Sequence, residues 1–468
     1  MVFSSLIFIY MFLPVTLILY FIAPKKIKNF IILVMSLIFY GWGEPVYILL
    51  MLASLIIDYL GALLIEKTRH QKEKSRFIFV TILVINLSVL FFFKYYGFLI
   101  DNINGIFHTS LKIKSLPLPL GISFYTFQLI SYIADVYMDK AKPQKNIINF
   151  ATYIAMFPQI TSGPIVQYNY IASQLSEREI NISNVGVGLE RFILGLGKKM
   201  ILANNIGLIW TQIKATSVGE ISVLSAWIGI IAFTLQIYFD FSGYSDMAIG
   251  VANMLGFEFK ENFNYPYISK SITEFWRRWH ISLSSWFRDY IYIPLGGNRR
   301  GMLIQFRNIF IVWFTTGLWH GASWNFIIWG VYFGVLISIE KLFLLKVLDK
   351  LPRFIQNIYT MILVVIGWVF FDTSKLGEAV SYIKTMFGFA GRPLIDNYAR
   401  YIMQTNVIIL ILAIICATPL IKNIIRILKE KGKFPGALIV VVLCIGILTI
   451  STAYLVSESY TPFLYFKF

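Results

Sequence analysis

Charged residues are scarce in this sequence for a chain of its length. Asp, Glu, Lys and Arg make up 14% of the 468 residues, whereas the apolar set AVILMFWYC makes up 57%, and the mean hydropathy is +0.70. Soluble globular domains carry about 25% charged residues. A chain with so little charge needs a surface that lipid covers instead of water, so the composition predicts an integral membrane protein.

Several features with known functions are also missing. Two cysteines, Cys416 and Cys444, lie in apolar runs and provide neither a disulfide framework nor a metal-ligand cluster. The sequence contains no phosphate-binding glycine loop followed by lysine, no dinucleotide fingerprint and no metal-ligand spacing. We therefore expect no metal and no permanently bound cofactor.

Long apolar runs, in contrast, are abundant. With their flanks, several supply the roughly 20 apolar residues that a membrane-spanning helix needs. Such runs occupy residues 6–22, 77–93, 226–239, 327–339, 358–371, 406–417 and 437–450. We predict an all-α, polytopic transmembrane fold of about ten to twelve membrane segments, some of them broken.

The net charge of +17 comes from short basic clusters between the apolar runs, at residues 24–28, 66–76 and 422–433. Such clusters are typical of cytoplasmic loops, so we expect a lipid bilayer and no nucleic acid as partner. The first apolar run lacks a basic start and a small-residue cleavage site, which favours a retained helix over a signal peptide. Because the first two clusters favour the same side, the chain between them must return, and residues 41–45 (GWGEP) are where it can turn.

The composition of the apolar runs changes along the chain. Residues 115–330 contain many polar and glycine residues within apolar stretches, whereas residues 1–114 and 331–468 are plainer. Polar groups at membrane depth are costly unless they line a cavity or face other protein. We therefore predict a single membrane domain over residues 1–468, in which a core at 115–330 surrounds a central chamber or tunnel and the two flanks supply peripheral helices.

The chain has only four histidines, and two of them, His70 and His108, lie in loop-like segments. His320 instead follows Trp319 at the end of an aromatic, apolar run. A neutral imidazole in a low-dielectric site holds its proton loosely, which suits a general base near neutral pH. His320 is thus the first candidate catalytic residue.

The neighbours of His320 leave a structural alternative open. Gly321 would let backbone or substrate approach closely, and Asn325 can orient the ring or a substrate carbonyl. The alternative is a histidine at a membrane interface that is hydrogen bonded by its neighbours.

His280 lies in the segment EFWRRWHISLSSWFRDY, which we interpret as an amphipathic helix. Residues three or four apart share one of its faces: Trp276, His280, Ser284 and Phe287. Trp279 lies beside that face, and Arg277 and Arg278 point elsewhere. The segment is either an interfacial helix with aromatic anchors, or a second wall of the chamber whose arginine pair attracts an anionic donor.

Two further groups are candidates for substrate binding. Asp240 and Tyr244 are four residues apart and so share a helix face; a carboxylate in the membrane marks a functional site or ties two helices together. The basic segment 294–301 is either a cytoplasmic loop or receives a diphosphate through Arg299 and Arg300.

Five stretches resemble the membrane-bound O-acyltransferase family, and most of all its bacterial alginate O-acetylation branch, with teichoic acid D-alanyl transfer proteins more distant. The stretches are 118–137, 157–168, 239–250, 262–301 and 317–330. The motifs WRRWH and WHGASWN are the most specific part of the resemblance.

The resemblance implies that His320 is the catalytic histidine and His280 the second characteristic one. It also implies a tunnel that joins a cytoplasmic acyl-CoA to an extracytoplasmic acceptor, across a bacterial cell membrane. We expect acetyl-CoA as the donor substrate, with its phosphates near the four arginines named above and with the tryptophans excluding water. The acceptor is a hydroxyl of a polysaccharide or of an extracytoplasmic, esterase-like partner protein.

Three other functions compete with this hypothesis. D-alanyl transfer to teichoic acid is the nearest alternative. A transporter would also suit broken helices and carboxylates within the membrane, and it would move a solute without consuming a thioester. A non-catalytic scaffold would tolerate loss of both His280 and His320. The paired Trp-His motifs favour the enzyme.

Overall fold

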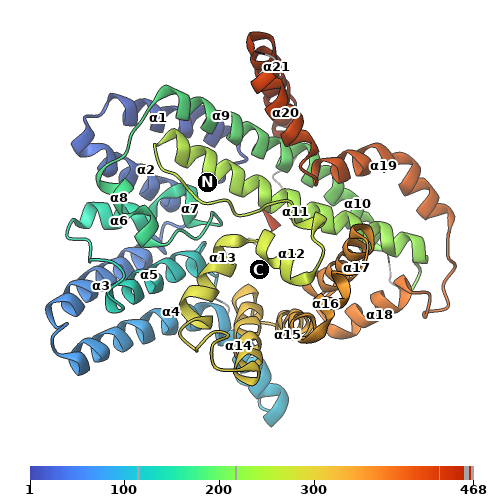
Figure 1. Cartoon of the computed structure of the whole chain (residues 1–468), viewed down its shortest axis with the longest axis horizontal. Helices are drawn as coiled ribbons and strands as arrows, with labels where there is room; N and C mark the ends of the chain where they lie inside the picture. Colours follow the sequence, from blue (N-terminus) through green and yellow to red (C-terminus); the bar gives the residue numbers. More distant parts are fainter. Residues whose placement is uncertain (113–115, 217–218, 432, 458–462, 465–468) are drawn as a thin grey trace. The chain divides into compact units, whose positions relative to one another are not determined.

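The computed structural model describes residues 1–112, 116–216, 219–431, 433–457 and 463–464, and every regular element in these ranges is a helix (Figure 1). The predicted all-α membrane fold is confirmed. Eight described helical segments are long and apolar enough to cross a membrane: Lys25–Gly43, Tyr47–Lys67, Lys72–Phe107, Ile182–Ala215, Val223–Met254, Arg353–Asp372, Asn397–Cys416 and Pro435–Ser457. A shorter apolar helix covers Phe8–Ile22.

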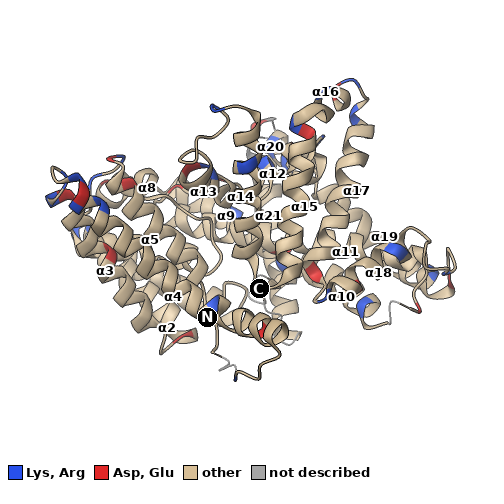
Figure 2. Cartoon of the chain, turned by 90° about the horizontal axis from the view of Figure 1, so that it is seen from below, with Lys and Arg blue, Asp and Glu red and all other residues tan. Residues whose placement is uncertain are grey.

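The connections between the first helices lie at the break and the basic cluster that the sequence predicts. α2 (Lys28–Gly43) ends within the predicted break, and α3 (Ile48–Lys67) begins just after it. The basic cluster at 66–76 joins α3 to α4 (Lys72–Phe107). Figure 2 shows Lys, Arg, Asp and Glu concentrated at such connections, whereas the middles of the helices carry few of them.

The apolar helices differ in how much of each is buried. In the apolar windows of the segments Ile182–Ala215 and Val223–Met254, 72% of the residues are buried inside the protein. For Lys72–Phe107, Asn397–Cys416 and Pro435–Ser457 the share is 17%. The flanking helices therefore present most of their apolar residues outward, as lipid-facing helices do.

The chain divides into two compact units, and the first comprises residues 1–192 and 245–260. Besides α2 to α4, its helices are η1 (Phe8–Phe12), α1 (Leu13–Ile22), η2 (Lys25–Ile27), α5 (Ile122–Tyr137), α6 (Ile147–Ala155), α7 (Phe157–Ile160) and α8 (Tyr168–Ser176). Buried polar groups hold it together: the Asn86 amide donates to both carboxylate oxygens of Asp58, and Arg178 donates to Tyr20 and Asn29.

The second unit comprises residues 193–244 and 261–468 and contains both candidate histidines. Its helices are η3 (Lys198–Ala203), α10 (Asn204–Ala215), η4 (Pro266–Ile268), α12 (Ile272–Arg278), α13 (Ile281–Phe287), η5 (Arg288–Tyr292), α14 (Met302–His320), α15 (Trp324–Ile339), η6 (Glu340–Leu344), α16 (Leu345–Leu348), α17 (Arg353–Asp372), α18 (Leu376–Met386), α19 (Asn397–Cys416), α20 (Leu420–Lys431) and α21 (Lys433–Ser457). Two long helices, α9 (Ile182–Gly197) and α11 (Val223–Met254), contribute residues to both units. The single domain with a central chamber stays a prediction.

Candidate active site

The hairpin of α14 and α15 carries His320 at its tip, and the two helices run side by side (Figure 1). Glycines bring their backbones together. A Cβ added to Gly317 would lie 2.4 Å from the carbonyl oxygen of Phe326, and one added to Gly330 would lie 2.3 Å from that of Trp313. No side chain fits at such distances, so these two glycines set the helix separation that positions His320.

Aromatic rings surround the imidazole of His320, whose exposed fraction is 4%. Four ring centroids lie between 4.9 and 6.4 Å from it, those of Trp319, Trp329, Phe371 and Phe326. A Cβ on Gly321 would lie 2.3 Å from the Phe326 ring. The group that approaches this glycine closely is therefore a side chain of the protein. The ring therefore lies in an apolar, low-dielectric environment.

His280 lies between two helices, and the prediction of one continuous amphipathic helix through it was wrong. α12 ends at Arg278, α13 begins at Ile281, and His280 has φ +45° and ψ +54°, in the left-handed region. The helical hydrogen-bond ladder stops there because the N–H of Ile281 donates to the carbonyl of Asn262 instead. The turn places the His280 side chain inward, with 1% of it exposed.

Asn262 fixes the tautomer of His280, and the sequence analysis missed it. The side-chain oxygen of Asn262 accepts from the backbone N–H and the hydroxyl of Ser282, so this atom is the amide oxygen. Nδ1 of His280 lies 3.2 Å from the same oxygen and can bond to it only by donating. The proton of the neutral ring is thus on Nδ1, and Nε2 carries the lone pair.

Burial also keeps His280 neutral. Desolvation lowers the pKa of His280 to about 3, because the charged imidazolium is disfavoured in a dry interior. The ring is therefore an acceptor at Nε2 throughout the physiological pH range.

Trp319 brings the two histidines together. Its ring centroid lies 6.0 Å from that of His280 and 5.0 Å from that of His320. The ring of Phe241 also packs against His280, with its centroid 4.7 Å from that of the imidazole. Two imidazoles from different helix junctions therefore share a single indole within one aromatic cluster.

The other predicted tryptophans belong to the same cluster. The ring of Trp276 lies 5.4 Å from that of Trp329, and Trp279 lies 4.9 Å from Trp368. Two caps hold α12 in place. The Ser271 hydroxyl accepts from the N–H of Glu274, and the buried carboxylate of Glu340 accepts from the N–H groups of Ile272 and Thr273.

Other predicted binding residues have different partners. The Asn325 amide donates to the backbone oxygen and hydroxyl of Thr373 and so ties α15 to the end of α17. That Asn325 orients the His320 ring or a substrate carbonyl stays a prediction. Asp240 forms a buried ion pair with Lys199, 2.5 Å apart, and accepts from the N–H of Leu464. Its carboxylate therefore ties helices together, which is the more modest of the two interpretations.

The remaining predicted residues divide between the surface and the interior. Arg277, Arg299 and Arg300 are exposed. Arg278 pairs with Glu274 at 2.8 Å. Tyr244 is buried, with its ring 4.8 Å from that of Phe463. Among the residues that the structure describes, no group of three or more His, Cys, Asp and Glu side chains is placed to hold a metal ion.

Comparison with known proteins identifies the family. The model of the membrane-bound O-acyltransferase family matches residues 140–373, which include His280, His320 and Asn262. A probable alginate O-acetylase of Azotobacter vinelandii is 39% identical over 88% of this chain and 83% of its own length. The chain belongs to the membrane-bound O-acyltransferase family. It is therefore a multi-pass membrane enzyme that transfers an acyl group to oxygen.

Two other relatives have lower sequence identity to this chain. A peptidoglycan O-acetyltransferase of Helicobacter pylori is 34% identical over 84% of this chain and 80% of its own length. A teichoic acid D-alanyltransferase of Bacillus subtilis is more distant, at 28% identity over 58% of this chain and 70% of its own length. This O-acyltransferase is thus more similar to the two O-acetyl-transferring relatives than to the D-alanyl-transferring one.

Proposed function

We propose that this O-acyltransferase lies in a bacterial cytoplasmic membrane and moves an acetyl group from cytoplasmic acetyl-CoA to a hydroxyl of an extracytoplasmic polysaccharide. The transfer is direct or passes through an esterase-like partner protein. The names of the A. vinelandii and H. pylori relatives, which concern O-acetylation of alginate and of peptidoglycan, support this choice of acyl group and acceptor.

One observation carries the proposal: His280 and His320 share Trp319 inside an aromatic cluster. A thioester is lost to hydrolysis if water reaches it beside a base, so such chemistry needs a dry site. The buried aromatic residues provide that environment, and the two imidazoles provide groups that can accept a proton.

His320 is the proposed base. It takes the proton from the acceptor hydroxyl as that oxygen attacks the carbonyl carbon of the thioester. The carbon–sulfur bond then breaks, and the departing thiolate of CoA takes the proton from His320. The products are an ester and free CoA, with no change in oxidation state. Nε2 of His280 accepts a hydrogen bond from a second N–H or O–H group of the acceptor and so holds the acceptor for the attack.

The proposal is tested with the purified full chain in lipid nanodiscs, acetyl-labelled acetyl-CoA and a panel of acceptors. The panel contains alginate, peptidoglycan fragments, teichoic acid and each polymer with its candidate extracytoplasmic partner protein. We expect label in an alkali-labile ester on one polysaccharide and equimolar free CoA. Solute flux without thioester consumption would replace the proposal with a transporter, and activity with only a D-alanyl thioester would replace the acyl group.

A further inference from the structure

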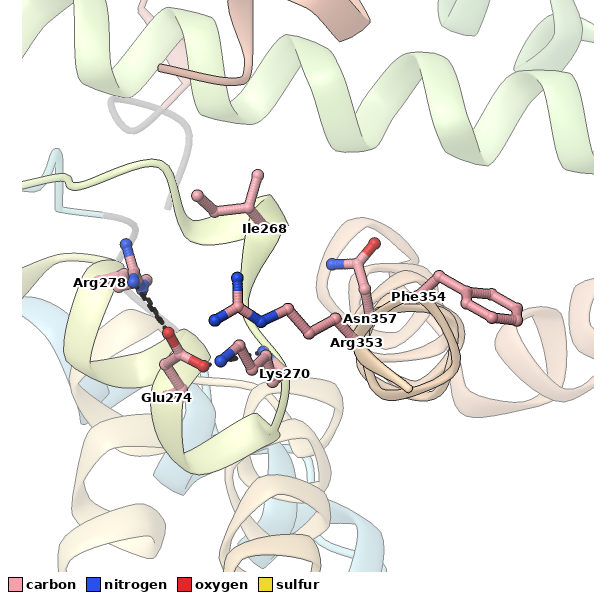
Figure 3. Close-up of a pocket in the computed structure, with 7 residues that line it drawn as sticks. All are labelled: Ile268, Lys270, Glu274, Arg278, Arg353, Phe354 and Asn357. Atoms are coloured by element: carbon pink, nitrogen blue, oxygen red, sulfur yellow. Dashed lines mark hydrogen bonds and ion pairs between the residues drawn. The ribbon is translucent and has the colours of Figure 1, made fainter. Parts of the chain in front are cut away.

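A basic pocket lies at the beginning of α17, which is one of the helices long enough to cross a membrane. Its volume is about 510 Å³, within the range of small-molecule sites. Seven residues line it, and Figure 3 shows them: Ile268, Lys270, Glu274, Arg278, Arg353, Phe354 and Asn357. None of them has a part in the proposed chemistry at Nε2 of His280 or at His320.

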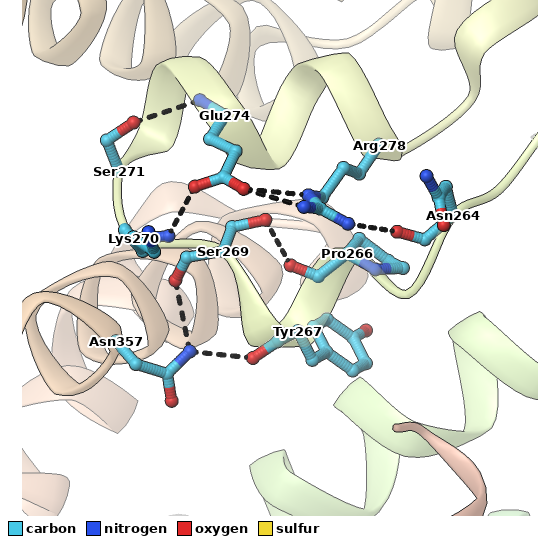
Figure 4. A network of polar contacts seen from close by, with 9 residues as sticks. All are labelled: Asn264, Pro266, Tyr267, Ser269, Lys270, Ser271, Glu274, Arg278 and Asn357. Atoms are coloured by element: carbon cyan, nitrogen blue, oxygen red, sulfur yellow. Dashed lines mark hydrogen bonds and ion pairs between the residues drawn. The ribbon is translucent and has the colours of Figure 1, made fainter. Parts of the chain in front are cut away.

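The pocket has a fixed wall. The Asn357 amide donates to the carbonyl oxygens of Tyr267 and Ser269, at 2.8 and 3.0 Å, and so fastens the first turns of α17 to η4 (Figure 4). The Ser269 hydroxyl closes η4 by donating to Pro266. These bonds hold Arg353 of α17 opposite Lys270, so the two cations face one space (Figure 3).

The only carboxylate in the lining is already satisfied. One oxygen of Glu274 accepts from Nε and Nη2 of Arg278, at 2.9 and 2.8 Å, and the other accepts from the backbone N–H of Lys270. Arg278 makes one further bond, to the carbonyl of Asn264. Glu274 therefore neutralises Arg278 and leaves the charges of Lys270 and Arg353 uncompensated.

Those two cations have no anionic partner in the part of the chain that the structure describes. The N-terminus of α17 adds to the positive field, because the N–H groups of Arg353 and Phe354 precede the first helical hydrogen bonds. Two cations that line one cavity beside a helix N-terminus favour a multiply charged anion over a carboxylate or a neutral sugar.

We propose that the basic pocket binds the phosphate of an organic phosphate ester. Guanidinium and ammonium groups supply charge-assisted hydrogen bonds to phosphate oxygens, and Ile268 supplies an apolar surface for the organic part. Two sources carry this chemistry: the nucleotide of the acyl donor and the headgroup of an anionic phospholipid. If the source is the donor, the inference rests on the proposed function, and it places the phosphate contact at Lys270 and Arg353 instead of at the four arginines Arg277, Arg278, Arg299 and Arg300.

Binding to the full chain in phosphatidylcholine nanodiscs tests this inference without turnover. The first probe is adenosine 3′,5′-bisphosphate, with adenosine as its phosphate-free counterpart, and affinity is measured by calorimetry. The second is phosphatidylglycerol added to the nanodiscs and detected as lipid retained on purification. The variants are Lys270→Gln with Arg353→Gln, and Glu274→Gln. Lys350→Gln is the matched control, because Lys350 is an exposed cation just before α17 that does not line the pocket.

We expect the bisphosphate to bind and adenosine not to bind. The double variant should weaken binding roughly ten- to hundredfold, and Lys350→Gln should leave it unchanged. Glu274→Gln should tighten it, because Arg278 then lacks its counterion. Retention of phosphatidylglycerol with the same dependence on the variants would assign the pocket to lipid. The inference is overturned if neither probe binds, or if the double variant and Lys350→Gln behave alike.

The outcome is independent of the transfer assay. A wild-type protein that transfers acetyl groups but binds neither probe would refute the pocket and leave the proposed function standing. A protein that binds a probe in the pocket but transfers no acyl group would refute the proposed function and leave the pocket standing.

Discussion

The two histidines are held by different forces, although each follows a tryptophan and each lies at a helix boundary. At the α12–α13 junction, hydrogen bonds hold His280: Asn262 fixes its Nδ1 proton, and the backbone turns left-handed. At the α14–α15 junction, His320 ends a regular helix and is packed by rings on several sides. The first junction thus fixes the tautomer of His280, and the second surrounds His320 with apolar rings.

This difference suggests that the two histidines have different roles in the reaction. A histidine whose proton is committed to an amide offers one defined acceptor atom, which suits holding a substrate hydroxyl. A histidine within a low-dielectric aromatic cluster suits proton transfer, because a small change in its surroundings alters its basicity strongly. The predictions below test this comparison, from the largest expected effect to the smallest.

The largest effect is expected from the histidines themselves. His320→Ala should lower the rate of acetyl transfer by about 10²- to 10⁴-fold, as loss of a general base does. His280→Ala should cost less, because it removes a positioning contact. The double variant should be little worse than His320→Ala alone, because the positioning contact from His280 has little effect on the rate once the base is lost. Fully multiplicative losses would contradict a shared centre.

Asn262 is expected to matter next. Asn262→Ala should reduce transfer about ten- to hundredfold, because a buried hydrogen bond is lost and Nδ1 no longer has to carry the proton. Asn262→Asp should retain the bond but raise the pKa of His280, because the adjacent negative charge favours the imidazolium. The acid limb of the pH–rate profile should then move to higher pH. Asn423→Ala, at an exposed position of α20, is the control. An unshifted profile in Asn262→Asp would argue against the assigned tautomer.

The α14–α15 junction depends on backbone contact. Gly317→Ala should therefore destabilise the protein by about 1–3 kcal/mol, because its Cβ overlaps the Phe326 carbonyl. Gly377→Ala, in α18 with nothing within 4 Å, should be neutral or slightly stabilising. Thermal unfolding followed by tryptophan fluorescence measures both. Equal midpoints for the two variants would show that close packing at Gly317 is not needed.

Near neutral pH, the smallest effect is expected on the pH dependence of stability. The pKa of His280 is lowered to about 3 in the folded protein, against an ordinary value near 6.5. The unfolded chain therefore binds the extra proton first, and stability is lost as the pH falls from about 6.5 towards 3. His280→Gln does not titrate, so its stability should fall less steeply over this window. If stability fell equally steeply with pH in the wild type and in His280→Gln, His280 would already be protonated in the folded protein.

Much of the fold and the two central residues were predictable from the sequence. Apolar runs and basic clusters indicated the helices and the turn at 41–45. The Trp-His motifs singled out His280 and His320 because their neighbours are local in sequence. The cap at Ser271 and Glu274 also has a readable pattern, a serine followed three residues later by glutamate.

The partners that fix the site were not predictable, because they come from distant segments. Asn262 is eighteen residues from His280, and Lys199 and Glu340 reach α11 and α12 only through tertiary packing. The left-handed backbone at His280 was missed for the same reason: helical spacing continues through it, and only the contact with Asn262 breaks the helix.

The central claim is that the imidazole of His320 takes the proton during acyl transfer. Its most direct test compares His320→Ala with His70→Ala, an exposed histidine in the connection between α3 and α4. Both are assayed with the same labelled acetyl-CoA and acceptor, at equal amounts of folded protein. We predict at least about a hundredfold loss for His320→Ala alone, with an unchanged unfolding midpoint. Equal transfer rates in the two variants would contradict the account.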